Sequence, residues 1–85
     1  MYKVTVSRSA EKELSKIPKG IVNRIGTAIE SLMENPRPTG SKKLKGTDEN
    51  LWRIRIGDYR VVYDIEDSIR IIDIKKVGHG KDIYQ

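Results

Sequence analysis

The sequence predicts an α+β fold in which one antiparallel sheet carries helices on one of its faces. Three observations predict it: a short alternating segment at the start, two amphipathic helical patterns directly after it, and three alternating segments in the second half of the chain. This order gives an N-terminal strand, an αα-hairpin and a three-stranded antiparallel meander. The 85 residues allow one modest core, so we expect a single domain over residues 1–85.

The first strand is expected at residues 2–6, where apolar and polar side chains alternate as on a half-buried strand. Ser7 and Ser9 follow, and either serine oxygen can accept a hydrogen bond from the first turn of a helix. The apolar face of that helix consists of Ala10, Leu14 and Ile17. Pro18 ends the helix, because proline lacks the N–H group that a continuing helix needs.

The second helix has the strongest periodic pattern in the chain. Its apolar residues recur at helical spacing and are Ile21, Ile25, Ala28, Ile29 and Leu32. It should end by Asn35, since the residue before Pro36 is disfavoured in the α conformation. Gly26 costs about 1 kcal/mol relative to alanine inside a helix, which predicts that the first helix crosses close to it. Because Pro18 leaves almost no linker, the two helices should form an αα-hairpin.

A loop is expected at residues 36–41, where proline, glycine and serine are concentrated. A basic segment follows, in which Lys42, Lys43 and Lys45 surround the single apolar residue Leu44. Two interpretations of this segment are equally open: a solvated loop that buries one leucine, or a contact with phosphate groups.

Residues 50–64 form two alternating runs joined at Gly57-Asp58, a pair that favours the positive φ angles of a tight hairpin turn. A two-residue turn places Arg55 opposite Arg60, and directly opposed residues share one face of the sheet. The core face should consist of Trp52, Ile54, Ile56, Tyr59, Val61 and Tyr63. The other face carries Arg53, Arg55 and Arg60. Facing like charges destabilise a hairpin by up to about 1 kcal/mol, so this face indicates an anionic partner.

The last strand is expected at residues 69–77, whose centre is apolar on both alternations, as in a strand covered on both sides. If residues 67–68 form a two-residue loop, Asp73 lies opposite Val62 on the arginine face and could orient a guanidinium group. The closing segment, residues 78–85, has two glycines and is expected to be flexible.

The composition, with 36% hydrophobic and 34% charged residues, is that of a folded globular domain. Seventeen Lys and Arg against twelve Asp and Glu give a net charge of +5, which favours a polyphosphate, an anionic membrane or an acidic protein as partner. Without cysteine, disulfides and thiolate metal sites are excluded, and the cytoplasm is the expected location. No signal peptide or membrane span is expected, because no apolar run approaches about 18 residues.

The inventory of reactive side chains is small. One histidine and no cysteine make a catalytic metal unexpected, and no cofactor is expected. A serine triad lacks its G-x-S-x-G turn, and the lone Gly78-x-Gly80 is followed by no helical pattern that would make it a phosphate loop. What remains is a cluster of cations, the imidazole of His79 and the phenol of Tyr84.

These groups suffice for metal-free RNA cleavage, in which the 2′-hydroxyl attacks the adjacent phosphate and charge builds on the phosphoryl oxygens. A guanidinium aimed at that charge contributes about 3 to 4 kcal/mol to the transition state. His79, a lysine or Tyr84 would act as general acid or base, and Tyr84 would stack on an unpaired base. The plain alternatives are a surface histidine, a tyrosine that plugs its own core, and a solvated arginine face paired with Asp64 and Asp73.

With these residues the sequence resembles the RelE and ParE superfamily of bacterial and archaeal type II toxins. The resemblance covers nearly the whole chain and rests on both helices and on residues 43–46, 51–63, 77–79 and 83–84. The run from Leu-Trp-Arg to Gly-Asp-Tyr-Arg is specific to it. The resemblance implies a RelE-like fold. RelE-like members are endoribonucleases that cut messenger RNA in the ribosomal decoding site, whereas ParE-like members are associated with poisoning DNA gyrase.

The resemblance also implies roles for single residues. Arg53 and Arg55 lie where RelE-like toxins place two basic residues, as phosphate binders or base. Arg60 matches an arginine implicated in stabilising the transition-state phosphate, and Tyr84 matches the terminal tyrosine that stacks on the substrate base. His79 would assist proton transfer. The side chains expected to bind RNA or the ribosome are Lys42, Lys43, Lys45 and Lys81.

One position departs from the pattern. Gly80 stands where many relatives have an arginine, so Lys81 or His79 would have to compensate. The sequence favours a ribosome-dependent mRNA endoribonuclease; the alternatives are a gyrase inhibitor without nuclease activity, which Gly80 favours, and a degenerate toxin that only binds its antitoxin. The expected partners are a cognate acidic antitoxin, the ribosome and mRNA. DNA is expected only indirectly through the antitoxin, and no membrane is expected.

Overall fold

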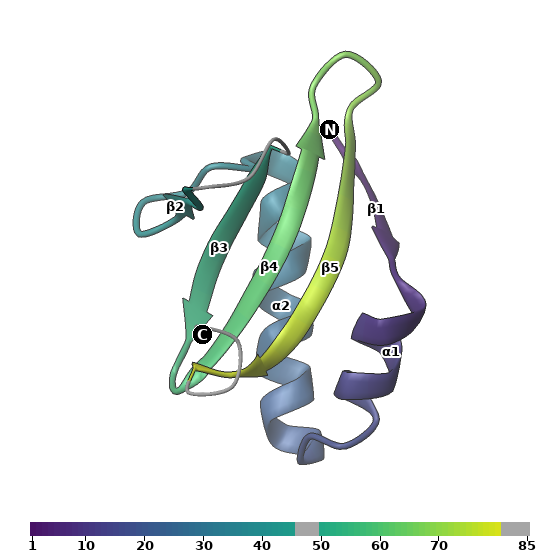
Figure 1. Ribbon diagram of the computed structural model, residues 1–85, viewed down its shortest axis with the longest axis vertical. Coiled ribbons are helices and arrows are strands. Elements are labelled where there is room, and N and C mark those ends of the chain that lie inside the picture. Colours follow the sequence, from purple (N-terminus) through teal and green to yellow (C-terminus); the bar gives the residue numbers. More distant parts are fainter. Residues whose placement is uncertain (46–49, 81–85) are drawn as a thin grey trace.

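The computed structural model describes residues 1–45 and 50–80. Within these residues two helices cover one face of a single sheet (Figure 1). In chain order the elements are β1 (Lys3–Val6), α1 (Arg8–Leu14), α2 (Lys19–Glu34), β2 (Lys42–Lys43), β3 (Leu51–Ile56), β4 (Tyr59–Glu66) and β5 (Ile71–His79). The predicted α+β fold, with an αα-hairpin followed by an antiparallel meander, is confirmed.

The described part of the sheet has five strands in the order β1-β5-β4-β3-β2. Strands β3, β4 and β5 form the meander, whereas β1 runs parallel to β5, from Lys3 opposite Ile71 to Val6 opposite Ile74. The expectation of a wholly antiparallel sheet was therefore wrong at this edge. Parallel pairing results because β1 leads into α1 at the end of the sheet where β5 also ends, and α1 packs against β5 (Figure 1).

The basic segment also adds to the sheet. Lys42 lies opposite Arg53 and Lys43 opposite Trp52, so two residues expected in a loop form the short edge strand β2. Both lysines are exposed and Leu44 is half-buried.

The β3–β4 hairpin has the predicted register. Gly57 has a φ of 60°, Arg55 lies opposite Arg60, and Arg53 lies opposite Val62. The helix-facing side of the two strands supplies much of the core, through the buried side chains of Ile54, Ile56, Val61 and Tyr63. The helices contribute Ala10, Ile25 and Leu32 to the same cluster. The alternation of apolar and polar residues in the hairpin thus predicted which side chains face the helices.

The β4–β5 connection differs from its prediction. Its loop consists of four residues, 67–70, and Arg70 takes a left-handed φ of 53°. The longer loop shifts β5 by two residues, which preserves its faces, since side chains alternate with a period of two. Asp73 consequently lies opposite Asp64 rather than Val62. The prediction that Asp73 sits beside the arginines was therefore wrong.

Asp73 has other partners at the β1 edge. Its Oδ1 accepts a hydrogen bond of 2.9 Å from the Thr5 hydroxyl, and its Oδ2 lies 2.8 Å from Lys75 Nζ. Lys75 is the extra residue of a β-bulge, because Tyr63 pairs with Ile74 and Val62 already pairs with Lys76. The bulge puts the buried Val77 on the same face as Ile74, so beyond Lys75 the helix-facing positions of this strand change from even-numbered to odd-numbered residues.

Helix α1 begins at a serine cap, whereas α2 follows Pro18 without a side-chain cap. Ser7 caps α1, and its Oγ accepts a hydrogen bond of 3.2 Å from the N–H of Ala10. A Cβ added at Gly26 would meet nothing within 4 Å, so the predicted close crossing of the helices at this glycine was wrong. Nothing in the structure accounts for Gly26. Neither described helix is long and apolar enough to span a membrane.

Tyr63 anchors the loop after α2 to the sheet. Its side chain is fully buried, and its hydroxyl donates a hydrogen bond of 2.7 Å to the carbonyl oxygen of Pro36. Burial raises the pKa of the Tyr63 phenol to about 12, so the group stays protonated and donates at any physiological pH.

Asp67 ties three segments together at the surface. Tyr2 donates a hydrogen bond of 2.7 Å to its Oδ1, and Arg37 donates to both carboxylate oxygens at 3.2 and 2.8 Å. The hydrogen bonds from Arg37 and, to a smaller extent, the one from Tyr2 lower the Asp67 pKa from 3.8 to about 2. The Arg37 guanidinium also lies 5.1 Å from the centroid of a Trp52 ring.

We expect Tyr63→Phe to lower the free energy of unfolding by about 1 to 3 kcal/mol, because it leaves the buried Pro36 carbonyl oxygen without its donor. Urea denaturation followed by circular dichroism measures the change. Tyr2→Phe is the matched control, since it deletes the same hydroxyl from an exposed hydrogen bond and should cost less. Equal losses in the two variants would contradict this account.

Stability should also depend on the charge of Asp67. Because its pKa is lower in the folded protein, its stabilising contribution is complete above about pH 4 and is lost as the pH falls through about 2. The urea midpoint of wild type should therefore fall between pH 4 and pH 2 more steeply than that of Asp67→Asn. Arg37→Gln, which removes the principal donor, should flatten the profile in the same way. Parallel profiles for wild type and both variants would contradict the prediction.

Candidate nucleic-acid interface

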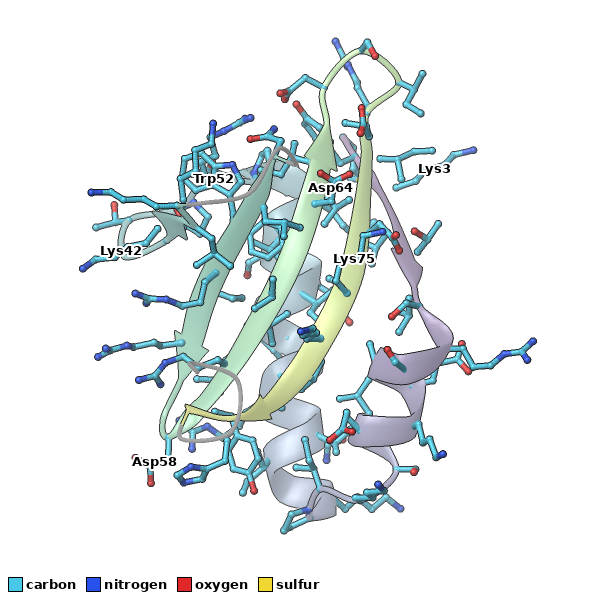
Figure 2. The ribbon with its side chains drawn as sticks, in the orientation of Figure 1. Lys3, Lys42, Trp52, Asp58, Asp64 and Lys75 are labelled. Carbon is cyan, nitrogen blue, oxygen red and sulfur yellow. The ribbon has the colours of Figure 1, made fainter. Side chains whose placement is uncertain are left out.

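The face of the sheet away from the helices carries the predicted arginines. Because Arg55 lies opposite Arg60 and Arg53 opposite Val62, all three arginines share this face. Figure 2 views the sheet from this side, with the helices behind it. We call Arg53, Arg55 and Arg60 the arginine cluster.

The members of the arginine cluster are buried to different extents. Arg53 is only 7% exposed, Arg60 is half-buried and Arg55 is exposed. The Nε atoms of Arg53 and Arg60 are buried. The face is therefore not the uniformly solvated surface of the plain alternative, and Asp73, one of its suggested ion-pair partners, lies instead with Thr5 and Lys75. Stems held in this way favour a fixed position of the charged heads.

Further cations lie around the cluster. Lys42 shares the face of Arg53, its cross-strand partner, whereas Lys43 shares that of Trp52. Lys45 is exposed just beyond β2. The bulge puts Lys76 opposite Val62 on the cluster's face, a position that the unbulged prediction missed. The signal in the sequence was the spacing of three, rather than two, between the apolar residues at 74 and 77.

Arg24 of α2 lies near the turn of the β3–β4 hairpin. Arg24 and Arg55 line a hollow of about 430 Å³ together with Gly57. Arg55 also lines a second hollow of about 340 Å³, beside Pro38. The helical pattern had placed Arg24 only on an outward face, because the packing of α2 relative to the hairpin is not encoded in local periodicity.

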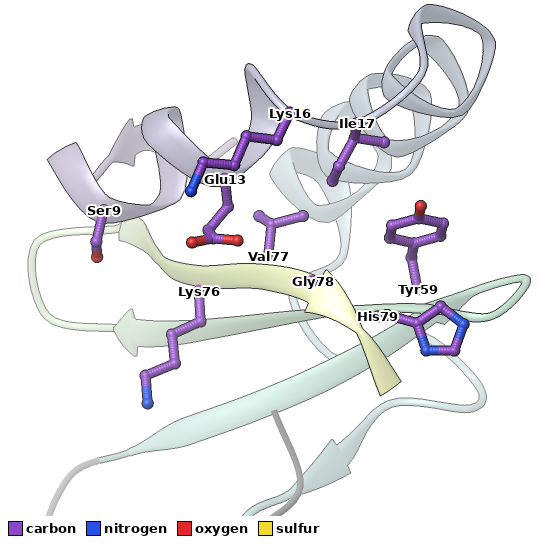
Figure 3. A pocket seen from close by; sticks show the side chains of 9 residues that line it. All are labelled: Ser9, Glu13, Lys16, Ile17, Tyr59, Lys76, Val77, Gly78 and His79. Carbon is purple, nitrogen blue, oxygen red and sulfur yellow. The ribbon is translucent and has the colours of Figure 1, made fainter. Parts of the chain in front are cut away.

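His79 lies apart from the arginine cluster. It belongs to β5 rather than to the flexible segment that was predicted, and its cross-strand partner is Tyr59 on the helix-facing side. The two rings meet edge to face, with centroids 5.7 Å apart and planes at 70°. Both line a hollow of about 380 Å³ between α1 and the end of β5, with Glu13 and Lys16 across from them (Figure 3). The structure thus pairs the His79 ring with Tyr59, on the side of the sheet opposite the arginine cluster.

Gly80 follows β5 directly and lies against the cluster. Its N–H group donates a hydrogen bond of 2.8 Å to the carbonyl oxygen of Asp58 in the hairpin turn. The head of Arg60 packs against the Gly80 α-carbon. Tyr84 and Lys81, both predicted to act at the site, lie outside the described residues.

The chemistry that this face permits is the binding of phosphate groups. Guanidinium and ammonium groups from four strands converge on one face, while Asp73 is engaged at the far edge by Thr5 and Lys75. Such groups are suited to a phosphate whose charge increases during a reaction. Among the described residues, no three His, Cys, Asp or Glu side chains gather as metal ligands.

Comparison with known proteins places this geometry in a family. The family model for the ParE toxin of the type II toxin–antitoxin system parDE matches residues 4–84. The chain is 31% identical to toxin RelE of Mycobacterium tuberculosis over 99% of this chain and 87% of that one. It is 33% identical to toxin RelE3 of Methanocaldococcus jannaschii over 96% of this chain and 94% of that one.

Solved structures agree. A chain of the archaeal RelE–RelB complex from Pyrococcus horikoshii matches with a TM-score of 0.81 and 32% identity, over 92% of this chain and 93% of that one. The isolated E. coli RelE toxin matches with a TM-score of 0.80 over 93% of this chain and 84% of that one, and at 23% identity it supports the fold alone. The chain therefore belongs to the ParE toxin family and is a RelE-like toxin of a type II toxin–antitoxin system.

Proposed function

We propose that the protein is a ribosome-dependent endoribonuclease that cleaves mRNA by metal-free attack of a 2′-hydroxyl on the adjacent phosphate, and so inhibits translation. The observation that carries this proposal is the arginine cluster on one face of the hairpin, with two of its Nε atoms buried. The relatives named RelE toxins support a toxin of this kind, and the endoribonuclease activity is what the resemblance to RelE-like toxins implies.

Arg60 is the proposed transition-state clamp. It lies on the middle strand, between Arg55 on β3 and Gly78 on β5, and shares a face with Arg53 and Arg55. Arg53 and Arg55 bind the flanking phosphates, or one of them accepts the 2′-hydroxyl proton. The side chains that we assign to outer contacts with RNA or the ribosome are Arg24, Lys42, Lys43, Lys45 and Lys76.

Three further roles stay predictions from the sequence. Tyr84 is proposed to stack on a substrate base, and Lys81 to contact RNA. His79 is proposed to assist proton transfer, and its position beside Tyr59 calls for its own test. His79→Ala separates the possibilities, because loss of a proton donor or acceptor changes the pH profile of cleavage, whereas loss of packing lowers stability.

The proposed protein partner is a cognate acidic antitoxin. Toxins of similar structure are found in complexes with RelB antitoxins. A net charge of +5 and the exposed basic residues of this chain suit an acidic chain that orders on binding. Contact with DNA is proposed only through that antitoxin.

The second candidate function is inhibition of DNA gyrase without nuclease activity. It is favoured by Gly80, which stands where the resemblance to RelE-like toxins expects an arginine, and by the match to the ParE family model. An early DNA-damage response with intact transcripts would identify it.

Arg60→Ala should lower the rate of mRNA cleavage on ribosomes by about 10² to 10³-fold, because it removes a donor aimed at the developing charge. Primer extension on purified ribosomes with an open decoding site measures the rate. Arg8→Ala is the control, since it removes the same charge from the exposed start of α1 and should cleave like wild type. Growth arrest by wild-type protein with all transcripts intact would contradict the nuclease proposal.

Lys75 and Lys76 offer a neighbouring pair for testing the RNA contacts. Lys76→Ala should weaken binding of a single-stranded RNA and reduce the slope of log K against log salt by about 0.7, the value for one phosphate contact. Lys75→Ala removes the same charge from a side chain engaged by Asp73, and should leave the slope unchanged. Fluorescence anisotropy with a labelled oligonucleotide at several salt concentrations gives both slopes. Equal slopes in the two variants would contradict the placement of Lys76.

A further inference from the structure

The backbone at Gly80 is in direct contact with the head of Arg60. A Cβ built on Gly80 would lie 3.0 Å from Arg60 Cζ and 3.2 and 3.3 Å from its two terminal nitrogens. These distances are shorter than an ordinary van der Waals contact, and they involve the three outer atoms of the guanidinium. The guanidinium therefore occupies the space that any side chain at position 80 would need.

The need for glycine at this position does not come from the backbone. The left-handed glycines of the described chain are Gly40, with a φ of 94°, and Gly57, with a φ of 60°; Gly80 is not among them. Alanine is thus compatible with the backbone conformation of residue 80, and the close approach of Arg60 is what a side chain there would disturb.

The same strand end also makes room for the stem of Arg60. Gly78 lies directly opposite Arg60 on the same face, so no side chain stands beside the arginine from that strand. The Arg60 Nε is buried. The hydrogen bond from Gly80 N–H to the carbonyl oxygen of Asp58, two residues before Arg60, fixes this backbone to the hairpin turn. Gly78 and Gly80 therefore flank the Arg60 side chain along its length.

We infer that Gly80 is a positioning residue for Arg60. It acts through Arg60 and does not touch substrate: its bare α-carbon sets the plane and the depth of the guanidinium that is proposed to clamp the phosphate. A methyl group at position 80 would displace that head by a few tenths of an ångström. Because a misplacement of about 1 Å can lower a rate about 10²-fold, a shift of a few tenths of an ångström should still lower the rate measurably. The inference rests on the proposed function of Arg60.

The test compares Gly80→Ala with Gly26→Ala. The second is a matched control, because a Cβ at Gly26 meets nothing within 4 Å. Gly80→Ala should lower kcat for ribosomal mRNA cleavage about tenfold with little change in KM, whereas Gly26→Ala should cleave like wild type. The thermal midpoint of Gly80→Ala should stay close to that of wild type, which excludes unfolding as the cause.

A double-mutant cycle separates positioning from a general structural effect. Lysine at position 60 lacks the outer fork that a Cβ at residue 80 would meet, so Gly80→Ala added to Arg60→Lys should have no further effect on the rate. A tenfold loss in both backgrounds would overturn the inference, because Gly80 would then act on something other than Arg60.

A spectroscopic measurement tests the contact without any activity. The Nε–Hε signal of Arg60 in the ¹⁵N-correlated NMR spectrum, assigned by its loss in Arg60→Lys, should shift in Gly80→Ala and stay in place in Gly26→Ala. If wild type proves not to cleave RNA, the proposed function fails while this shift still supports the positioning contact. An unmoved signal together with an unchanged thermal midpoint would overturn the inference.

Discussion

One hydrogen-bonded register, that of the β3–β4 hairpin, determines where the three members of the arginine cluster lie. Gly57, with its φ of 60°, closes the turn in two residues and so sets Arg55 against Arg60. A slip of one residue would turn these charges toward the apolar cluster around Tyr63, and an unpaired charge in such a core costs many kcal/mol. The buried face therefore enforces the register, and the register gathers like charges on the opposite face.

The arginine cluster lies away from the hydrogen bonds that link different segments of the chain at the other end of the sheet. The interactions of Asp67 with Tyr2 and Arg37 lie at the β4–β5 loop, at the opposite end of the sheet from the Gly57 turn (Figure 1). The bond from Tyr63 to Pro36 anchors the loop that leaves α2. The like charges of the arginine cluster therefore lie at a distance from these anchoring contacts, as expected when a surface is shaped for a ligand.

How much of the fold could be predicted depended on how far apart in the sequence the residues that determine each feature lie. The turn at Gly57 and the apolar face of α2 follow from neighbouring residues and were found where the sequence placed them, and the structure chose Ser7 over Ser9 as the cap of α1. The position of Asp73 was missed, because a left-handed residue such as Arg70 in a longer loop gives no strong sequence signal.

The candidate site was predictable to the same degree. The arginine cluster follows from alternation within one hairpin, so its three members were found together. Lys76 depended on a bulge and Arg24 on the packing of a helix, which alternation does not encode. The contact between Gly80 and Arg60 depends on the absence of a side chain at residue 80. Sequence periodicity gives no signal for a contact of this kind between residues that are far apart in the chain.

The parallel pairing of β1 with β5 has a consequence for how the protein is made. Thr5 and Asp73, which face each other across this pair, are separated by 68 residues, so the first strand cannot pair until residues 71–74 have been synthesised. Contacts of such long range also form slowly. The β3–β4 hairpin is therefore synthesised before β1 can pair with β5. During this interval a partner that is translated at the same time can bind the arginine hairpin.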